Sequence, residues 1–493
     1  MMRWIAVFAF TLLHVGHACA QQRNAHWPIP PGSWLHFDAD GTQVEPWATS
    51  SIYNYQSASI SSPTGALQLY NDQHGIYNAH DDTLIAGSFP AQIVTAGQGW
   101  LYCPRPGDSD RIAGFGMRRD ASNILGAELK SYSFQRDLGT DLWQLEAGGT
   151  QVLIDSTAWK LTAVAHANGV DYWIITHLHS SDTFAAFRLS ATGVDPVPVI
   201  SHTGFYMPIE SGGCCEIALT GSLVASYDGT QLSLSVRPHG SSFGNILYSM
   251  LYHFDTSTGV VTANTILPGI PLTVRYGTEF SMDGTKLYQL HANYNGDGDT
   301  PASITLRQYE LSSQDPAQIA ESAVVIHLES GLLFEFELFV SNALNMATGP
   351  DGRIYMLWRN NGSLSVINEP NAAGAACNFV VEQVQLPDTL ANTLPNQCKR
   401  YHDSELSVGV PAMRPEAVEL EVWPVPTEGL VHVRSRNAGP LLVVDALGRT
   451  VFSRSIGKNT TLPVDLSRSA AGAYAVHLLA PGAAPVHRMI IKR

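Results

Sequence analysis

The chain has 493 residues, enough for two or three domains or for one large repeat array with a small domain beside it. Charged residues make up only 14% of the sequence, whereas glycine (42), tyrosine (18) and tryptophan (10) are plentiful, which favours many short strands over helices. The formal net charge is -15 and is unevenly distributed: residues 416–493 carry nine Lys/Arg against six Asp/Glu, whereas residues 1–415 carry 19 against 37. So acidic a segment argues against binding to nucleic acid or to an anionic membrane surface.

The amino terminus predicts a secretory signal peptide over residues 1–20. Arg3 supplies the positive start, residues 4–13 the apolar core, and Ala18-Cys19-Ala20 a small-x-small cleavage site. Lipidation of Cys19 is the alternative, but the preceding Gly16 and His17 do not suit it. No other run approaches the ~20 apolar residues that a membrane span needs, so no transmembrane segment is expected.

Five cysteines remain after cleavage, an odd and sparse number for an exported chain. Cys377 and Cys398 lie 21 residues apart around one loop, and we expect them to form a disulfide. The adjacent Cys214 and Cys215 either form a vicinal bridge or pair elsewhere, and the pairing of Cys103 stays open. None of them has the spacing of a metal site.

Short strands begin after a polar, proline-rich leader at residues 21–33. Residues 34–38 predict a strand, residues 58–60 and 66–70 a hairpin, and residues 75–78 a further strand. Residues 91–150 are the least regular region. Asn168-Gly169 then predicts the turn between strands at 161–166 and 171–177, because Asn-Gly is a strong hairpin signal.

An Asp-Gly hairpin recurs at Asp228, Asp283 and Asp351, each time between two apolar runs and before a third strand. Such a unit cannot bury both of its faces alone, so repeated units are expected to stack around an axis. The sequence therefore predicts an all-β fold, with a β-propeller over residues 34–400 of about seven blades (range six to eight). The strand from Trp34 to Phe37 is expected to complete the last blade.

A linker is predicted at residues 401–415, where periodicity is absent and two prolines occur. Residues 416–493 follow as short alternating strands joined by glycine turns, which predicts a small carboxy-terminal β-sandwich.

Four ordered motifs lie in these last residues. They comprise Trp423-Pro424-Val425-Pro426-Thr427-Glu428-Gly429, Asp445-Ala446-Leu447-Gly448-Arg449, Asp465-Leu466-Ser467 with Gly472-Ala473-Tyr474, and the basic end Lys492-Arg493. This segment resembles the carboxy-terminal sorting domain of type IX secretion substrates, with Val425 where asparagine is usual. The resemblance implies recognition by the type IX machinery, export across the outer membrane, removal of the domain, and a mature protein that is secreted or held at the cell surface.

Residues 34–400 look like the propeller ectodomains joined to that sorting domain in such bacteria. The group is defined by architecture and shares no activity, so the resemblance implies no catalytic residues.

Metal and calcium sites are weaker candidates. His166, His177, His179 and His202 cluster in the sequence, with His177 and His179 spaced as ligands on one strand face, but no third ligand is evident. Residues 295–299 and 38–41 resemble the front of a calcium loop without its twelfth-position glutamate. We expect no cofactor and no metal, with a structural calcium in an exposed loop as the exception.

Catalytic candidates are equally few. The chain contains no Gly-x-Ser-x-Gly. Glu335 and Glu337 alternate with aromatics, which would place two carboxylates on one strand face as glycoside hydrolysis requires, although a solvated strand face explains them better. Loop tryptophans such as Trp47 or Trp100 could stack on sugars, but core packing is the simpler interpretation.

The sequence favours an exported β-propeller that binds an unidentified extracellular ligand over its central channel without catalysis. The alternatives are a secreted propeller hydrolase acting on glycans or peptides, and a structural surface-layer component that self-associates.

Overall fold

The computed structural model divides into two units, residues 1–406 and 407–493, called here the body and the C-terminal domain. It describes residues 22–493 apart from 31, 39–40, 48–56, 73, 87–97, 120–126, 205, 207–220, 236–248, 268–272, 295–300, 314, 331–344, 358–361, 388–392, 403–419, 436–437, 446–448 and 479–485. The predicted signal peptide lies outside the described residues.

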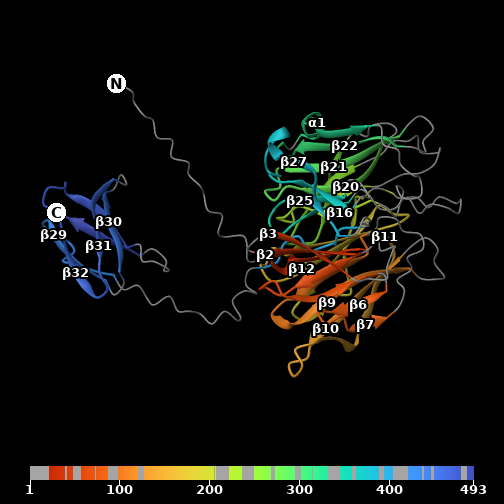
Figure 1. The fold of residues 1–493 in the computed structure, drawn as a ribbon, viewed down its shortest axis with the longest axis horizontal. Coiled ribbons are helices and arrows are strands. Elements are labelled where there is room, and N and C mark those ends of the chain that lie inside the picture. Colours follow the sequence, from red (N-terminus) through yellow and green to blue (C-terminus); the bar gives the residue numbers. More distant parts are fainter. Residues whose placement is uncertain are drawn as a thin grey trace. The chain divides into compact units, whose positions relative to one another are not determined.

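The described strands of the body form six sheets, each an antiparallel meander of consecutive strands (Figure 1). The first two sheets are β1 (His26–Ile29), β2 (Ser33–Asp38) and β3 (Gly41–Pro46), then β4 (Ala58–Ser61), β5 (Leu67–Asn71), β6 (Gly75–Asn78) and β7 (Thr83–Ala86). The third comprises β8 (Trp100–Arg105), β9 (Asp108–Arg119), β10 (Ala127–Arg136), β11 (Trp143–Ala165), β12 (Tyr172–Leu178), β13 (Thr183–Ser190), β14 (Gly193–Val194) and β15 (Val199–His202).

The last three sheets of the body have four strands each. They are β16 (Leu223–Ala225), β17 (Gln231–Ser235), β18 (Ser249–Phe254) and β19 (Val261–Leu267); β20 (Thr273–Phe280), β21 (Lys286–Tyr294), β22 (Pro301–Glu310) and β23 (Val324–Ser330); and β24 (Asn345–Thr348), β25 (Ile354–Leu357), β26 (Ser363–Ile367) and β27 (Phe379–Gln385). Two short helices are inserted, α1 (Pro316–Glu321) before β23 and the 3-10 helix η4 (Gly374–Cys377) before β27.

Strand β11 explains the eight-stranded sheet. Its first part pairs with β10 and its second part with β12, with an irregularity between Thr157 and Leu161 where Trp159 has a φ of 50°. One long strand therefore joins two antiparallel groups, β8–β11 and β11–β15. With β11 counted in both, the described strands of the body form seven antiparallel groups.

The predicted Asp-Gly hairpins are confirmed, and they are equivalent to one another. Asp228-Gly229, Asp283-Gly284 and Asp351-Gly352 each connect the first and second strands of successive sheets. The glycines have φ values of 76°, 69° and 80°, which an L side chain adopts only with strain. One supersecondary unit is therefore repeated along the chain.

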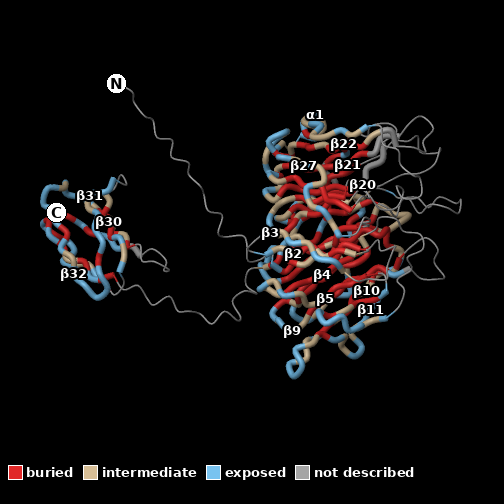
Figure 2. The backbone as a smooth tube through the Cα atoms, viewed as in Figure 1, coloured by how far each residue is buried: buried red, intermediate tan, exposed pale blue. Residues whose placement is uncertain are grey.

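The groups are arranged around an axis. First strands of successive groups contact one another, β1 with β4, β4 with β8, β11 with β16, β16 with β20 and β20 with β24. The first sheet also packs on the last, since Trp27, Ile29 and Leu35 share one apolar core with Tyr355 and Val366. Because the sheets face each other, strands such as β25 and β26 are buried along their whole length (Figure 2). The body is a β-propeller.

Two predictions about its start are wrong. The leader at residues 21–33 contributes β1, in which Trp27 and Ile29 are fully buried, so the body begins before residue 34. Residues Trp34 to Phe37 do not join the last sheet; they belong to β2, which pairs with β1 and β3. The first sheet closes the ring by packing face to face on β24–β27.

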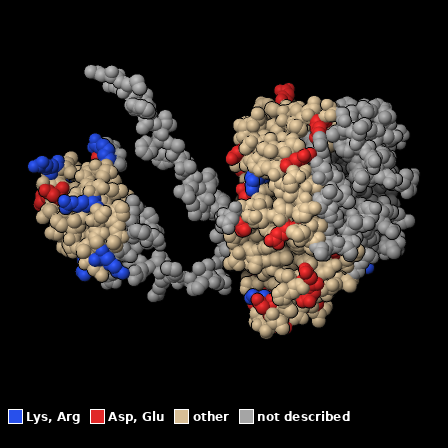
Figure 3. All heavy atoms as spheres, in the orientation of Figure 1, with Lys and Arg blue, Asp and Glu red and all other residues tan. Residues whose placement is uncertain are grey.

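The C-terminal domain packs two small sheets around one apolar core. One contains β28 (Leu420–Trp423), β29 (Leu430–Ser435) and β32 (Thr460–Asp465), and the other β31 (Thr450–Ile456), β30 (Gly439–Asp445), β33 (Gly472–Leu478) and β34 (Val486–Lys492). This is the predicted β-sandwich. Figure 3 shows carboxylates spread over the visible face of the body and Lys/Arg gathered on this domain.

Candidate functional site

Residues 393–402 form no strand, yet they lie along the inner strands of the body; we call them the closing segment. The Asn396 backbone N–H donates to the Ser57 carbonyl at 3.0 Å, and the Asn396 side chain donates to the Leu161 carbonyl at 2.9 Å. The Lys399 N–H donates to the Ala163 carbonyl at 3.2 Å. The closing segment is thus hydrogen-bonded to the residue just before β4 and to the second half of β11.

The same segment also reaches the first and last sheets. Leu394 is buried in their shared core, and the Tyr401 hydroxyl donates to the Asn24 side-chain oxygen at 2.9 Å. Asn24 in turn donates to the Cys398 carbonyl at 3.4 Å. Tyr401 is 2% exposed, so the first residues of the predicted linker belong to the body instead, while residues 403–415 lie outside the described residues.

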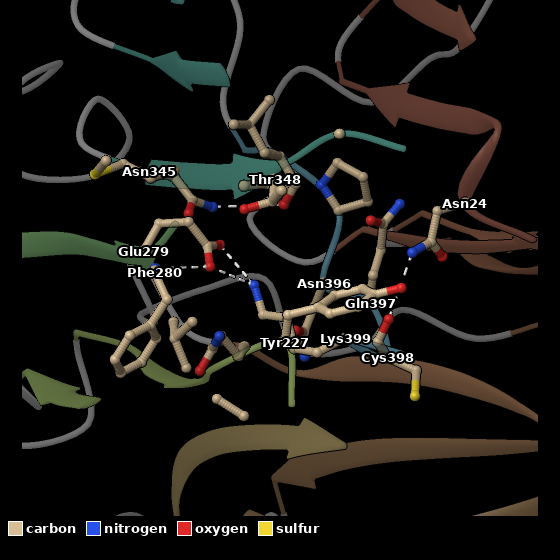
Figure 4. Close-up of a pocket in the computed structure, with 18 of the residues that line it drawn as sticks. Asn24, Tyr227, Glu279, Phe280, Asn345, Thr348, Asn396, Gln397, Cys398 and Lys399 are labelled. Atoms are coloured by element: carbon tan, nitrogen blue, oxygen red, sulfur yellow. Dashed lines mark hydrogen bonds and ion pairs between the residues drawn. The ribbon is translucent and has the colours of Figure 1, made fainter. Parts of the chain in front are cut away.

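An axial cavity remains between the closing segment and strands β16, β20 and β24 (Figure 4). Its volume is about 60 Å³, which is room for a few water molecules or one small polar group. Asn24, Gln98, Asn345, Thr348 and Gln397 supply amides and a hydroxyl to its wall. The cavity is therefore polar, although the sheets around it have apolar cores.

A buried ion pair crosses this cavity. The Lys399 ammonium lies 2.7 and 2.6 Å from the two carboxylate oxygens of Glu279 (Figure 4). Glu279 is 2% exposed, and burial raises the pKa of its carboxyl group above the ordinary value while Lys399 opposes that rise. The Phe280 N–H adds a hydrogen bond to the carboxylate at 3.1 Å. Each charge is compensated by the other, as a buried charge requires.

Two buried polar atoms in the wall have no protein partner, the Thr348 hydroxyl and the Gln397 amide nitrogen. Gln397 is 8% exposed. Buried polar groups are usually satisfied by protein or by ordered water, so both atoms are available to a molecule inside the cavity. Chemically, the site can hold a small group by hydrogen bonds beside a fixed, neutralised ion pair.

The histidines noted in the sequence have separate protein contacts. His177 is buried against Phe184, with ring centroids 4.6 Å apart, and burial lowers its pKa to about 4. His166 stacks on Trp173, and His202 contacts Asp182 at 3.2 Å. Within the described residues, no three His, Cys, Asp or Glu side chains are grouped as metal ligands.

The predicted Cys377–Cys398 disulfide is wrong. Both cysteines are free and buried. Cys377 is the last residue of η4 and packs in the apolar core that contains Tyr288. Cys398 lies in the closing segment and packs in a different apolar core, which is formed by residues of the second, third and fourth sheets. Separation into two cores keeps the thiols apart. Cys103 is also free, while Cys214 and Cys215 lie outside the described residues, as do Glu335, Glu337 and the loop at 295–299.

Motif residues of the C-terminal domain meet at one corner. The Lys492 ammonium donates to the carbonyls of Ser467 and Ser469, and residue Thr427 forms a bridge with Lys492. A Cβ on Gly429, whose φ is 146°, would lie 2.9 Å from the Ser467 Cα. Segments at 427–429, 465–469 and 492 therefore interlock in this domain.

The remaining residues of the C-terminal motifs lie at turns and strand ends of this domain. Asp445 accepts hydrogen bonds from the Arg449 N–H and guanidinium, both at the turn after β30. Tyr474 is buried and donates to the Ala470 carbonyl, and Gly472, with a φ of 153°, precedes it at the start of β33. Trp423 is 42% exposed at the end of β28, next to Pro424 and Pro426. Gly448 lies outside the described residues.

Taken together, the fold is that of a β-propeller body followed by a small β-sandwich domain. Residues 421–492 match the family model of the secretion system C-terminal sorting domain. That domain marks proteins of type IX secretion, so the chain is exported to the cell surface or the extracellular space. Among the described residues, no helix is long and apolar enough to cross a membrane.

No curated protein matches the chain in sequence. Among solved structures, it is similar to a puromycin-hydrolysing peptidase of Mycobacterium tuberculosis, with 13% identity and a TM-score of 0.37 over 97% of this chain and 60% of that one. A quinonprotein alcohol dehydrogenase-like protein of Bacteroides thetaiotaomicron matches with 10% identity and a TM-score of 0.33 over 65% of this chain and 67% of that one. A glucose dehydrogenase has 11% identity and a TM-score of 0.32 over 62% of this chain and 92% of that one. The chain thus spans less than two thirds of the peptidase.

The sequence does not reveal the closing segment or its ion pair. Glu279 follows Thr278 and precedes Phe280 in a predicted strand, and a carboxylate in such a strand is a signal of a buried partner only if its side chain faces the core. Lys399 lies near the end of the predicted propeller, where no pattern in the sequence gives it a role. Only the fold shows that these residues, 120 positions apart, form a pair.

Proposed function

We propose that the exported body is a non-catalytic binding protein whose ligand places a small polar group in the axial cavity. The observation that carries this proposal is the cavity wall, in which the Thr348 hydroxyl and the Gln397 amide lack protein partners while the nearby charges of Glu279 and Lys399 neutralise each other. A wall of amides and hydroxyls recognises by hydrogen bonding, whereas acid–base catalysis uses a titrating group that is free to exchange its proton.

The size of the cavity limits what enters it. Pockets that enclose a whole drug-sized ligand have volumes of roughly 300–1,000 Å³. The axial cavity is much smaller, with a volume of about 60 Å³. The ligand therefore inserts one terminal group and makes its other contacts outside the cavity.

The test uses the full-length purified protein against a glycan array, a peptide library and generic glycosidase and peptidase substrates. We expect saturable binding without turnover, and Gln397→Leu to weaken it about 10-fold because a hydrogen bond to the ligand is lost. Gln135→Leu is the matched control, since Gln135 is exposed on β10. Turnover that Glu279→Gln abolishes would instead establish the hydrolase alternative.

A further inference from the structure

Four aromatic rings lie together between the first and second sheets, and we call them the aromatic cluster: Trp34 on β2, Trp47 after β3, Tyr70 on β5 and Tyr77 on β6. Ring centroids are 5.2 Å apart for Trp34 and Trp47, 5.2 Å for Trp34 and Tyr70, and 5.8 Å for Trp47 and Tyr70. Tyr70 stacks on Tyr77 at 5.1 Å. Tyr70 is buried, whereas Trp34, Trp47 and Tyr77 are half-buried, so the three outer rings keep part of their surface open to solvent.

Carboxylates are bound to the two tyrosines of the cluster. The Tyr70 hydroxyl donates to Asp81 at 2.6 Å, and the Tyr77 hydroxyl donates to Asp72. Burial, together with Asp72, raises the pKa of Tyr77 to about 12, so its hydroxyl remains a donor at neutral pH. A phenol that donates to a carboxylate gains electron density in its ring, and this strengthens the attraction of the ring face for a cation.

The chain segment that forms the first two sheets carries formal charges of one sign. No lysine or arginine occurs between Arg23 and Arg105, while the same stretch contains six carboxylates, Asp38, Asp40, Glu45, Asp72, Asp81 and Asp82. Burial, and then the neighbouring His36, lower the pKa of His26 beside the cluster to about 4, so His26 is neutral at neutral pH. Such a potential repels anions and attracts cations.

We propose that the aromatic cluster binds a small organic ammonium ion, which lies against the adjacent, half-buried rings of Trp34 and Trp47 within the negative potential of the nearby carboxylates. Aromatic rings and carboxylates together select a weakly hydrated cation over a neutral molecule of the same shape. The site is separate from the axial cavity and does not depend on the function proposed for that cavity.

The first experiment compares two ligands of equal shape on the full-length protein by isothermal titration. Choline carries the charge, and 3,3-dimethylbutan-1-ol is its uncharged carbon isostere. We expect choline to bind about 5- to 30-fold more tightly than the isostere. Raising the salt from about 0.05 M to about 0.5 M should weaken only the binding of choline. Equal affinities, no saturable binding of choline, or binding of a neutral oligosaccharide in its place would overturn the proposal.

The second experiment locates the site. Trp47→Ala is expected to weaken choline about 5- to 30-fold, whereas Phe379→Ala should leave it unchanged. Phe379 is the matched control because it is also a half-buried ring, on β27, where it packs on His327 at 5.3 Å and against a core that contains none of the cluster residues. Gln397→Leu should also leave choline binding unchanged, which separates this site from the axial cavity. Choline affinity unaffected by Trp47→Ala in a folded variant would refute the assignment.

Discussion

The body and the C-terminal domain are both made of antiparallel sheets, but their chain ends are secured in different ways. In the body, Asn24 near the start contacts Cys398 and Tyr401 near the end, and the buried Glu279–Lys399 pair lies on the same seam. In the C-terminal domain, a turn at Gly429 and the last strand interlock through backbone contacts. The chain ends of the body are therefore joined by side-chain hydrogen bonds and an ion pair, whereas those of the C-terminal domain are joined by backbone hydrogen bonds and close backbone packing.

The largest expected effect comes from breaking the ion pair. Lys399→Met leaves the Glu279 carboxylate buried without its counter-charge, which typically costs about 3–5 kcal/mol of unfolding free energy. Urea unfolding at neutral pH should show this loss in the transition of the body and no change in that of the C-terminal domain. Equal loss in both transitions would refute the comparison.

The pH dependence of the stability loss in Lys399→Met distinguishes a lost charge interaction from lost packing. A carboxyl group with a raised pKa in the folded state contributes stability that is fully present below its ordinary pKa and is lost as the pH rises through the folded value. Removing Lys399 raises the folded pKa of Glu279 further, because Lys399 is the group that lowers it. The deficit of Lys399→Met should thus shrink between pH 7.5 and pH 5, and adding Glu279→Gln should recover most of it. A deficit independent of pH would mean that packing, not charge, is lost.

A smaller effect is expected in the C-terminal domain. Gly429→Ala forces a side chain into a φ of 146° and brings its Cβ to 2.9 Å from the Ser467 Cα, which should cost this domain about 1–3 kcal/mol. Gly472→Ala is the matched control: its φ is 153°, but nothing lies within 4 Å of the added Cβ. Urea unfolding should show a larger loss of unfolding free energy for Gly429→Ala than for Gly472→Ala. Equal losses would mean that the close contact between Gly429 and Ser467 does not stabilise the domain.

The sequence predicts the features of this fold that depend on neighbouring residues, and it does not predict those that depend on contacts between the chain ends. The Asp-Gly hairpins and the sorting motifs depend on residues a few positions apart, and both predictions are confirmed. The first strand and the closing segment depend on contacts between the two ends of the body, for which no local pattern exists. Trp27 was therefore assigned to a leader and Tyr401 to a linker, although both are buried.

The irregular region illustrates the same limit. Residues 91–150 lack Asp-Gly or Asn-Gly turns, yet they contain β8, β9, β10 and the beginning of β11. Their turn is made instead at residues 137–141, where Asp137 accepts from the backbone of Gly139 and Thr140. The candidate cavity was not predicted because its wall combines Asn24, which precedes β1, with residues of β16, β20 and β24 and of the closing segment.

The smallest effect tests a local element within the body. At the β20–β21 turn, the Asp283 carboxylate accepts from the Ser281 hydroxyl at 2.7 Å and from the Thr285 N–H at 3.0 Å. Asp283→Ala removes both bonds at an exposed turn and should cost about 1 kcal/mol, because water replaces part of what is lost. Asp283→Asn, which keeps an acceptor oxygen, should cost less. Thermal unfolding measures both variants, and a loss as large as that of Lys399→Met would show that the repeated turns, rather than the seam between the chain ends, limit the stability of the ring.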